Sequence, residues 1–196
     1  MPEPEFYTEP ARQILGGQAD GSIAAYQNLI ASGLFADACR WVAVHLPVQY
    51  AIWWGLICAM ETKGGPWDAA LVGQVTDWVA NPSETVQSRL LNQLWLETPQ
   101  SPVEYLAKAV SWTGQSMLPV HLPATAPNPQ HVGRMIAAAV DLAATEHAAL
   151  QPPQSYQRFL EFAADVDSGS LHWGSTAAST PKSSQNTKPQ GLFPGL

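Results

Sequence analysis

The chain has 196 residues, of which 46% are hydrophobic, and this size with eight tryptophans is enough for one well-packed domain and a tail. Its formal net charge of −7 repels phosphate backbones and anionic membrane surfaces, so we expect no nucleic-acid partner. The acidic, proline-broken start is unlike a secretory signal, and the longest apolar run, residues 51–60, is shorter than the roughly 20 residues of a membrane span, which predicts a cytoplasmic protein without such a span.

The first part of the chain predicts four helices separated by glycine and proline. Gly33 divides two of them, which we expect to form a helical hairpin, and Pro47 begins the next helix. That helix is apolar on almost every side, including Trp53, Trp54 and Cys58, so we expect other helices to surround it. The four predicted ranges are residues 10–15, 20–31, 34–45 and 47–60.

Two similar helix starts follow in the middle of the chain. Asn81-Pro82-Ser83-Glu84 and Ser101-Pro102-Val103-Glu104 each offer a capping side chain, a proline for the first helical position and a carboxylate that favours the positive helix end. Apolar residues recur at helical spacing after each start. Together with the segment after Pro66, these patterns predict helices over residues 67–80, 82–97 and 102–113.

Prolines also organise the last part of the chain. Between Gly114 and Pro129 lie three of them, Pro119, Pro123 and Pro127, which predicts an extended loop because neither a helix nor a central strand persists there. Asn128-Pro129 then caps a helix to about residue 150, Pro152-Pro153 ends it, and a last helix covers residues 155–166. Residues 168–196 are rich in Ser, Thr, Gly, Pro, Gln and Lys, which predicts a low-complexity flexible tail after a helical domain of residues 1–167.

The fold class follows from what the pattern contains and lacks. Helical spacing recurs throughout, whereas no segment shows the alternation of a half-buried strand. We therefore predict an all-α fold, either an irregular antiparallel bundle or a short solenoid-like array of about seven to eight helices, with a disordered C-terminal tail.

No residue pattern indicates catalysis or cofactor binding. None of the five histidines pairs with another histidine or a cysteine at metal-ligand spacing, and the Gly-Gly pairs lack a phosphate-loop motif. The two cysteines, Cys39 and Cys58, read as reduced core residues, and carboxylates such as Asp37, Glu61 and Asp141 are scattered singly on presumed polar faces. We predict no catalytic residue, no metal site and no cofactor.

A protein partner is the remaining expectation. Tyr105 and Trp112 lie on a second face of their helix, outside its apolar stripe, and aromatic side chains are enriched in interfaces. The tail carries apolar side chains on a polar tether, which suits docking in a groove. The candidate partner-binding residues are Tyr105, Trp112, Trp173, Leu192, Phe193 and Leu196. Oligomeric state is left open.

Residues 50–59, with Trp53-Trp54 and Cys58, and the acidic helices that follow to Trp112 resemble a small bacterial all-helical family of unknown function. We associate that family with gene neighbourhoods of contractile secretion machinery such as type VI systems. The resemblance covers roughly residues 34–167 and implies an accessory role without supplying any chemistry.

Three functional hypotheses follow. The first is a non-enzymatic cytosolic accessory or adaptor protein that acts through protein–protein contacts, linked to a bacterial secretion system. The second is a helical bundle that binds a small molecule or peptide between the Trp53-Trp54 helix and its neighbours. The third is a hydrolase, which requires polar residues that converge only in the folded chain.

Overall fold

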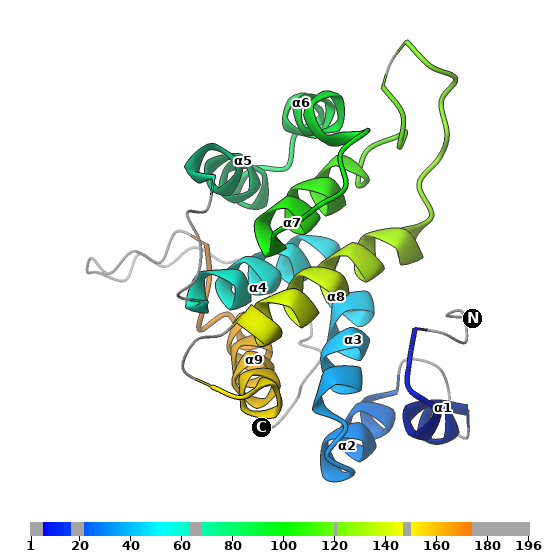
Figure 1. The fold of residues 1–196 in the computed structure, drawn as a ribbon, viewed down its shortest axis with the longest axis vertical. Helices are drawn as coiled ribbons and strands as arrows, with labels where there is room; N and C mark the ends of the chain where they lie inside the picture. Colours follow the sequence, from blue (N-terminus) through cyan, green and yellow to red (C-terminus); the bar gives the residue numbers. More distant parts are fainter. Residues whose placement is uncertain (1–5, 17–21, 63–67, 120, 147–149, 174–196) are drawn as a thin grey trace, which may run out of the picture.

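The computed structural model describes residues 6–16, 22–62, 68–119, 121–146 and 150–173. Within these ranges the protein forms nine α-helices and no strand, which confirms the all-α class (Figure 1). Each helix overlaps one of the ranges predicted from the sequence, although the total is slightly more than the seven to eight expected for the fold. The helices are α1 (Glu9–Gly16), α2 (Ile23–Ala31), α3 (Phe35–His45), α4 (Val48–Glu61), α5 (Ala69–Ala80), α6 (Glu84–Leu94), α7 (Pro102–Ser111), α8 (Pro129–Glu146) and α9 (Pro152–Ser168).

The two similar helix starts differ in the folded chain. At α7 the prediction is confirmed, because Ser101 caps the helix by accepting the Glu104 N–H at 3.3 Å and Pro102 begins it. At α6 the predicted cap was wrong. Ser83, in extended conformation, accepts the Val86 N–H at 3.4 Å, so Pro82 lies outside the helix and Asn81 follows the end of α5. The segment holds two side chains capable of capping, and the second one takes the role.

Other helix boundaries were also wrong by a few residues. Asp68 caps α5, which therefore begins at Ala69 and not at residue 67, and α6 ends at Leu94 and not at residue 97. Pro152 begins α9, three residues before the predicted start, because Gln151 and Gln154 form a reciprocal capping box before it. Helix α8 was predicted to run to about residue 150. The structure describes it to Glu146, and residues 147–149 lie outside the described residues.

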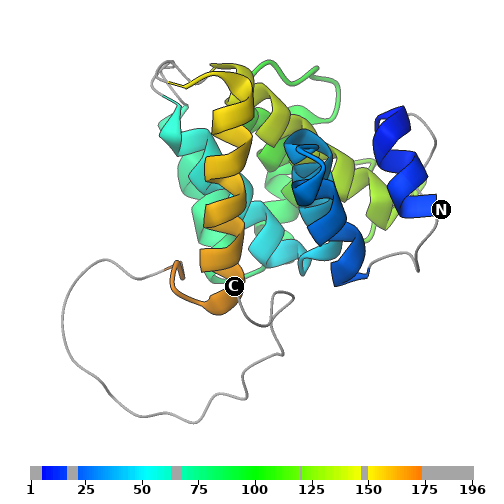
Figure 2. The same cartoon turned by 90° about the horizontal axis from the view of Figure 1, so that it is seen from below.

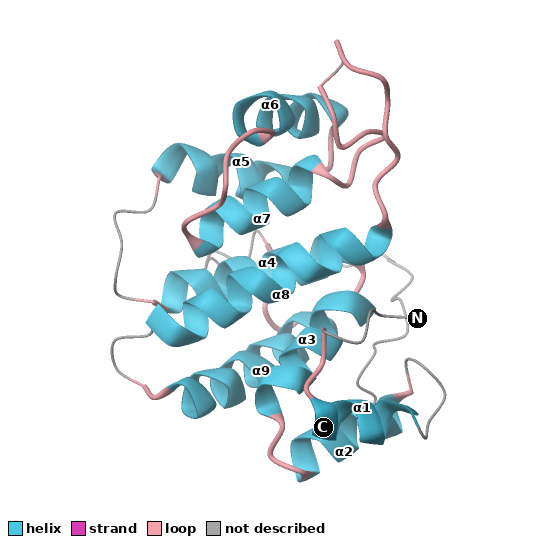
Figure 3. Ribbon diagram, turned by 45° about the vertical axis from the view of Figure 1, so that its right-hand side comes forward, coloured by secondary structure: helices cyan, strands magenta, loops and turns pink. Residues whose placement is uncertain are grey.

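The helices stack in tiers around α8. Helix α8 packs against α3, α4, α7 and α9, while α5 and α6 lie beyond α7 and α1 and α2 lie beyond α3 (Figures 1 and 3). The apolar helix α4 contacts α3, α5, α7, α8 and α9, as its lack of a polar face predicted. Gly133 allows α8 to lie close to α3. A Cβ at this position would lie only 2.6 Å from Val44 Cγ1, so a larger residue would push the two helices apart.

Two indole N–H groups of α4 hold α9 and the turn that follows it. Trp54 is fully buried and donates to the Phe159 carbonyl of α9 at 2.7 Å. The neighbouring Trp53 donates to the Leu171 carbonyl at 3.0 Å and so holds the turn that follows α9, drawn in orange in Figure 2. Residues 169–173, which the sequence assigned to the tail, therefore pack on the helical body. The rest of the predicted tail, residues 174–196, lies outside the described residues.

Candidate functional site

An apolar groove opens where the end of α3, the start of α4, the end of α7 and the start of α8 meet. Its volume is about 280 Å³. We call it the Trp112 groove, and its lining residues are Ala43, Val44, Leu46, Val48, Trp112, Thr113, Pro127, Val132, Gly133 and Ile136. It thus draws on four helices and on the loop that precedes α8.

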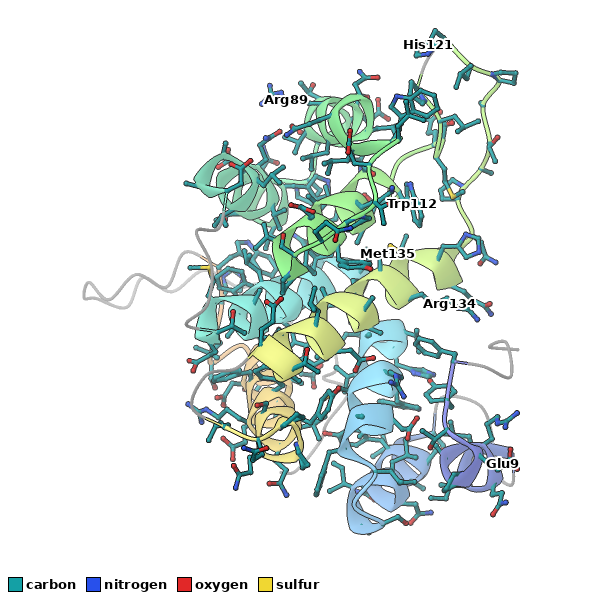
Figure 4. All side chains as sticks on the ribbon, in the orientation of Figure 1. Glu9, Arg89, Trp112, His121, Arg134 and Met135 are labelled. Atoms are coloured by element: carbon teal, nitrogen blue, oxygen red, sulfur yellow. The ribbon has the colours of Figure 1, made fainter. Side chains whose placement is uncertain are left out.

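Trp112 lies where α7 ends. Its backbone N–H caps that helix by donating to the Lys108 and Ala109 carbonyls, at 3.1 Å each. Its ring is half-buried. The Lys108 ammonium lies 5.8 Å from the centroid of the Trp112 ring, and the His131 ring centroid lies 6.3 Å from it. Figure 4 shows Trp112 close to the first turns of α8, which carry Arg134 and Met135.

The groove wall has almost no polar chemistry. Its lining includes no charged side chain, and Thr113 contributes the single hydroxyl. That hydroxyl donates to the Val110 carbonyl at 2.6 Å and accepts from Gln87 Nε2 at 2.7 Å, so its hydrogen bonds are made within the protein. A wall of this kind can desolvate apolar side chains but offers no acid, base or nucleophile.

Of the predicted partner-binding residues, the three that the structure describes do not form one site. Trp112 lines the groove, whereas Tyr105 is half-buried on α7, packs against the core and is not among the lining residues. Trp173 packs edge-on against Tyr50 of α4, with ring centroids 5.2 Å apart. Leu192, Phe193 and Leu196 lie outside the described residues.

A cluster around Arg40 contradicts the prediction that carboxylates are scattered on polar faces. Asp37 is only 2% exposed and accepts hydrogen bonds from the Thr8 N–H at 2.9 Å and the Thr8 hydroxyl at 2.7 Å. Arg40 lies between two carboxylates, 3.2 Å from Asp37 Oδ1 and 3.0 Å from Asp141 Oδ2. The Tyr156 hydroxyl donates to the other oxygen of Asp141 at 2.9 Å. The i, i+3 spacing of Asp37 and Arg40 is the one signal in the sequence that could have revealed this pair.

Two members of this cluster, Arg40 and Tyr156, keep their protons near neutral pH. Burial lowers the pKa of Arg40, but the Asp141 and Asp37 carboxylates raise it by more, so the guanidinium stays charged. Burial, and then the charge of Asp141, raise the pKa of the Tyr156 hydroxyl, which stays protonated. Together with Asp37, Asp141 and Thr8, these two side chains link α3, α8, α9 and the segment before α1. The cluster therefore has a structural role.

Both cysteines are buried free thiols, as predicted. Burial raises the pKa of Cys39 and of Cys58 well above the ordinary range, with a further contribution from Asp141 at Cys39 and from Cys39 at Cys58. A thiol of this kind is a poor nucleophile. In the described part of the chain, His, Cys, Asp and Glu side chains do not gather in threes that could hold a metal.

A wider hollow of about 960 Å³ lies between α9 and the α2–α3 hairpin. Tyr26, Ile30 and Phe35 line one side, and the exposed ion pair between Arg158 and Glu161 lies on the other. No pocket wall forms at Trp54, which the sequence placed beside a binding site, because that side chain has no exposed surface.

Comparison with known proteins gives one match. A family model described as "Family of unknown function (DUF6931)" matches residues 25–167. No curated protein and no solved structure matches the chain. Separately, none of the helices formed by the described residues is long and apolar enough to cross a membrane.

Proposed function

Because the chain belongs to the DUF6931 family, whose function is unknown, we propose a function from its own surface: a non-enzymatic adaptor that binds another protein through the Trp112 groove. The observation that carries this proposal is an apolar groove of about 280 Å³ with a half-buried tryptophan in its wall. Pockets for small molecules usually measure roughly 300–1,000 Å³. A groove near the lower end of that range can take one or two apolar side chains of a partner.

The physical chemistry of interfaces favours this groove. Binding energy in protein interfaces concentrates in a few apolar or aromatic anchors that fill well-packed pockets. Trp112 and Val48 present such a surface to an incoming side chain, and Val48 is 42% exposed although it is aliphatic. Burial of apolar area contributes about 25 cal/mol per Å², so a partner that covers these side chains gains binding free energy.

The non-enzymatic part of the proposal has its own support. The titratable groups that the fold brings together, around Arg40, are held by hydrogen bonds and ion pairs to one another. The thiols are buried and keep their protons. Neither group stands in the Trp112 groove.

A finer proposal concerns the setting of this adaptor. The resemblance of residues 34–167 to a family associated with contractile secretion machinery suggests that the partner is a component of such a system. The identity of the protein captured in the experiment below decides this point separately from the adaptor role.

The experiment compares two variants that make the same chemical change. Val48→Asp places a carboxylate on the Trp112 groove, at the first residue of α4, where a negative charge suits the helix dipole. Leu96→Asp places the same charge on a side chain that is 73% exposed and is not part of the groove. Each full-length variant, and the original chain, is used to capture partners from the native cell.

We expect the original chain and Leu96→Asp to capture the same protein and Val48→Asp to lose at least nine-tenths of it. Circular dichroism of the purified variants checks that both are folded. Equal capture by both variants, or no partner for any of them, overturns the proposal.

A second function is favoured by one observation. The hollow between α9 and the α2–α3 hairpin, at about 960 Å³, has the volume of a small-molecule site and carries the aromatic rings of Tyr26 and Phe35. Mass spectrometry of organic extracts from the purified protein tests for a bound molecule. A Phe35→Ala variant that still carries the same molecule would place it elsewhere.

A further inference from the structure

The Trp112 groove has a candidate occupant within the same chain. Residues 174–196 contain three large apolar side chains, Leu192, Phe193 and Leu196, all within five positions. A groove of about 280 Å³ accepts one or two side chains of this size rather than a whole helix. The chemistry of this short segment therefore matches the chemistry of the groove.

The point where this segment leaves the described residues lies near the groove. Trp173 packs on Tyr50 in the first turn of α4, and Val48 in that same turn lines the groove. Two residues along a helix are separated by about 200° of rotation, so Trp173 and the groove lie on opposite sides of one helical turn. A helix with its side chains is about 10–12 Å across, which sets the scale of the distance to be bridged.

The connecting chain is long enough for this distance. Leu192 follows Trp173 by 19 residues. A chain of that length can extend to about 60 Å, several times the width of one helix. A tethered segment that can reach its site binds at an effective concentration in the millimolar range for a short linker, so weak contacts are enough.

Charge favours contact between this segment and the rest of the molecule in general, although not with the groove in particular. Residues 174–196 carry Lys182 and Lys188 and no carboxylate, which gives them a formal charge of +2. The whole chain has a formal charge of −7, so the remainder carries −9. Opposite charges on the segment and the body increase the time that the segment spends close to the surface.

We propose that residues 192–196 bind in the Trp112 groove while no partner is present, with Phe193 as the main anchor. The biological role of this docking rests on the proposed function, because a partner can enter the groove only after residues 192–196 have been displaced. The docking itself is a property of the chain alone and is measured without a partner.

The test uses disulfide formation in the full-length chain. A Val48→Cys/Gly195→Cys variant places one thiol at the groove and one beside Phe193. The matched control, Met60→Cys/Gly195→Cys, places the first thiol near the other end of α4, about 18 Å further along the helix, at a side chain that is 52% exposed against 42% for Val48. Cys39 and Cys58 are no more than 1% exposed, so they do not compete under native conditions.

We expect the disulfide to form at least five times faster at position 48 than at position 60, as read by peptide mass after mild oxidation. Adding Phe193→Ser to both variants should bring the two rates to within a factor of two, because the tether remains and the anchor is lost. Equal rates before that substitution, or a preference for position 48 that survives it, overturn the inference. A strong preference combined with unchanged capture by Val48→Asp would instead overturn the proposed function and leave the docking intact.

Discussion

At the scale of single residues, the cluster around Arg40 shows how this chain keeps charges inside an apolar bundle. Asp37 is nearly inaccessible, yet its carboxylate accepts two hydrogen bonds from Thr8 and faces the Arg40 guanidinium. Burial of a charge costs several kcal/mol unless hydrogen bonds and an opposite charge replace water. Asp37 has both, so the cluster is stable as a unit and sensitive to the loss of any member.

This sensitivity leads to the first prediction. We expect Asp37→Asn to lower the free energy of unfolding by about 2 kcal/mol, because the partly buried Arg40 keeps one carboxylate fewer and Thr8 loses a charged acceptor. Urea denaturation followed by circular dichroism measures the change. The matched control is Glu161→Gln, which removes the carboxylate of an exposed i, i+3 pair with Arg158 and should cost less than about 0.5 kcal/mol. Equal costs for the two variants would contradict this account.

The buried thiols give the second prediction, which concerns pH. Burial raises the pKa of Cys39 and Cys58 in the folded chain, whereas an unfolded cysteine has a pKa of about 8.5. Above that pH the unfolded chain releases thiol protons that the folded chain keeps, so the free energy of unfolding falls as the pH rises. By pH 9.5 the loss amounts to roughly 1 kcal/mol per thiol.

Urea denaturation at pH 7.5 and pH 9.5 measures this loss. A Cys39→Ala/Cys58→Ala variant is the control, because it is less stable at both pH values but should show a much smaller difference between them. A difference of the same size in the variant would assign the pH dependence to other groups.

At the scale of helices, sequence reasoning located the elements better than their ends. Apolar spacing, prolines and glycines predicted the helices from α1 to α9, because these signals depend on residues that are close along the chain. The exact N-cap depends on which of several suitable side chains accepts a free backbone N–H at the helix start. Asn81 and Ser83 can both accept such a bond, and only the folded backbone, extended at Ser83, makes Ser83 the cap. Likewise, the sequence predicted that Pro152 ends one helix and that the next begins at residue 155, whereas Pro152 is itself the first residue of α9.

Close contacts between helices give the third prediction, a graded series of glycine substitutions. A Cβ at Gly133 would lie 2.6 Å from Val44 Cγ1 and 3.3 Å from backbone atoms of α3, so α8 must move and we expect Gly133→Ala to cost about 1–3 kcal/mol. At Gly55 the nearest atom is a terminal methyl carbon of the Leu106 side chain, 2.7 Å away, and a side-chain end can shift at less cost than backbone, so the cost should be smaller.

Gly73 is the control for this series. A Cβ there has no neighbour within 4 Å, and the residue lies inside α5, so Gly73→Ala should stabilise the protein by about 0.5–1 kcal/mol. Thermal unfolding orders the three variants. A cost at Gly73 equal to that at Gly133 would show that helix packing does not set the effect.

At the scale of the whole molecule, the Trp112 groove shows why the candidate site could be predicted only in part. The sequence identified Trp112 as an outward-facing aromatic residue, because that inference needs only the spacing within one helix. The other walls come from α3, α4 and α8, and the sequence separation between Val44 and Ile136 leaves no local pattern that would join them. The buried position of Asp37 was missed for the same reason, since its partner Thr8 comes from the segment before α1.

The last prediction joins the groove, the tail and the partner. If residues 192–196 occupy the Trp112 groove, a partner meets only the open fraction of molecules, and its apparent affinity is reduced by that fraction. Replacing Leu192, Phe193 and Leu196 by serine in the full-length chain should therefore raise the affinity for the captured partner about three- to tenfold. Titration of the purified partner by calorimetry gives the ratio. A Lys182→Ser/Lys188→Ser variant is the control, because it keeps the apolar anchors and should have a smaller effect. An unchanged affinity in the triple variant would rule out competition, and a weaker one would mean that the tail itself contacts the partner.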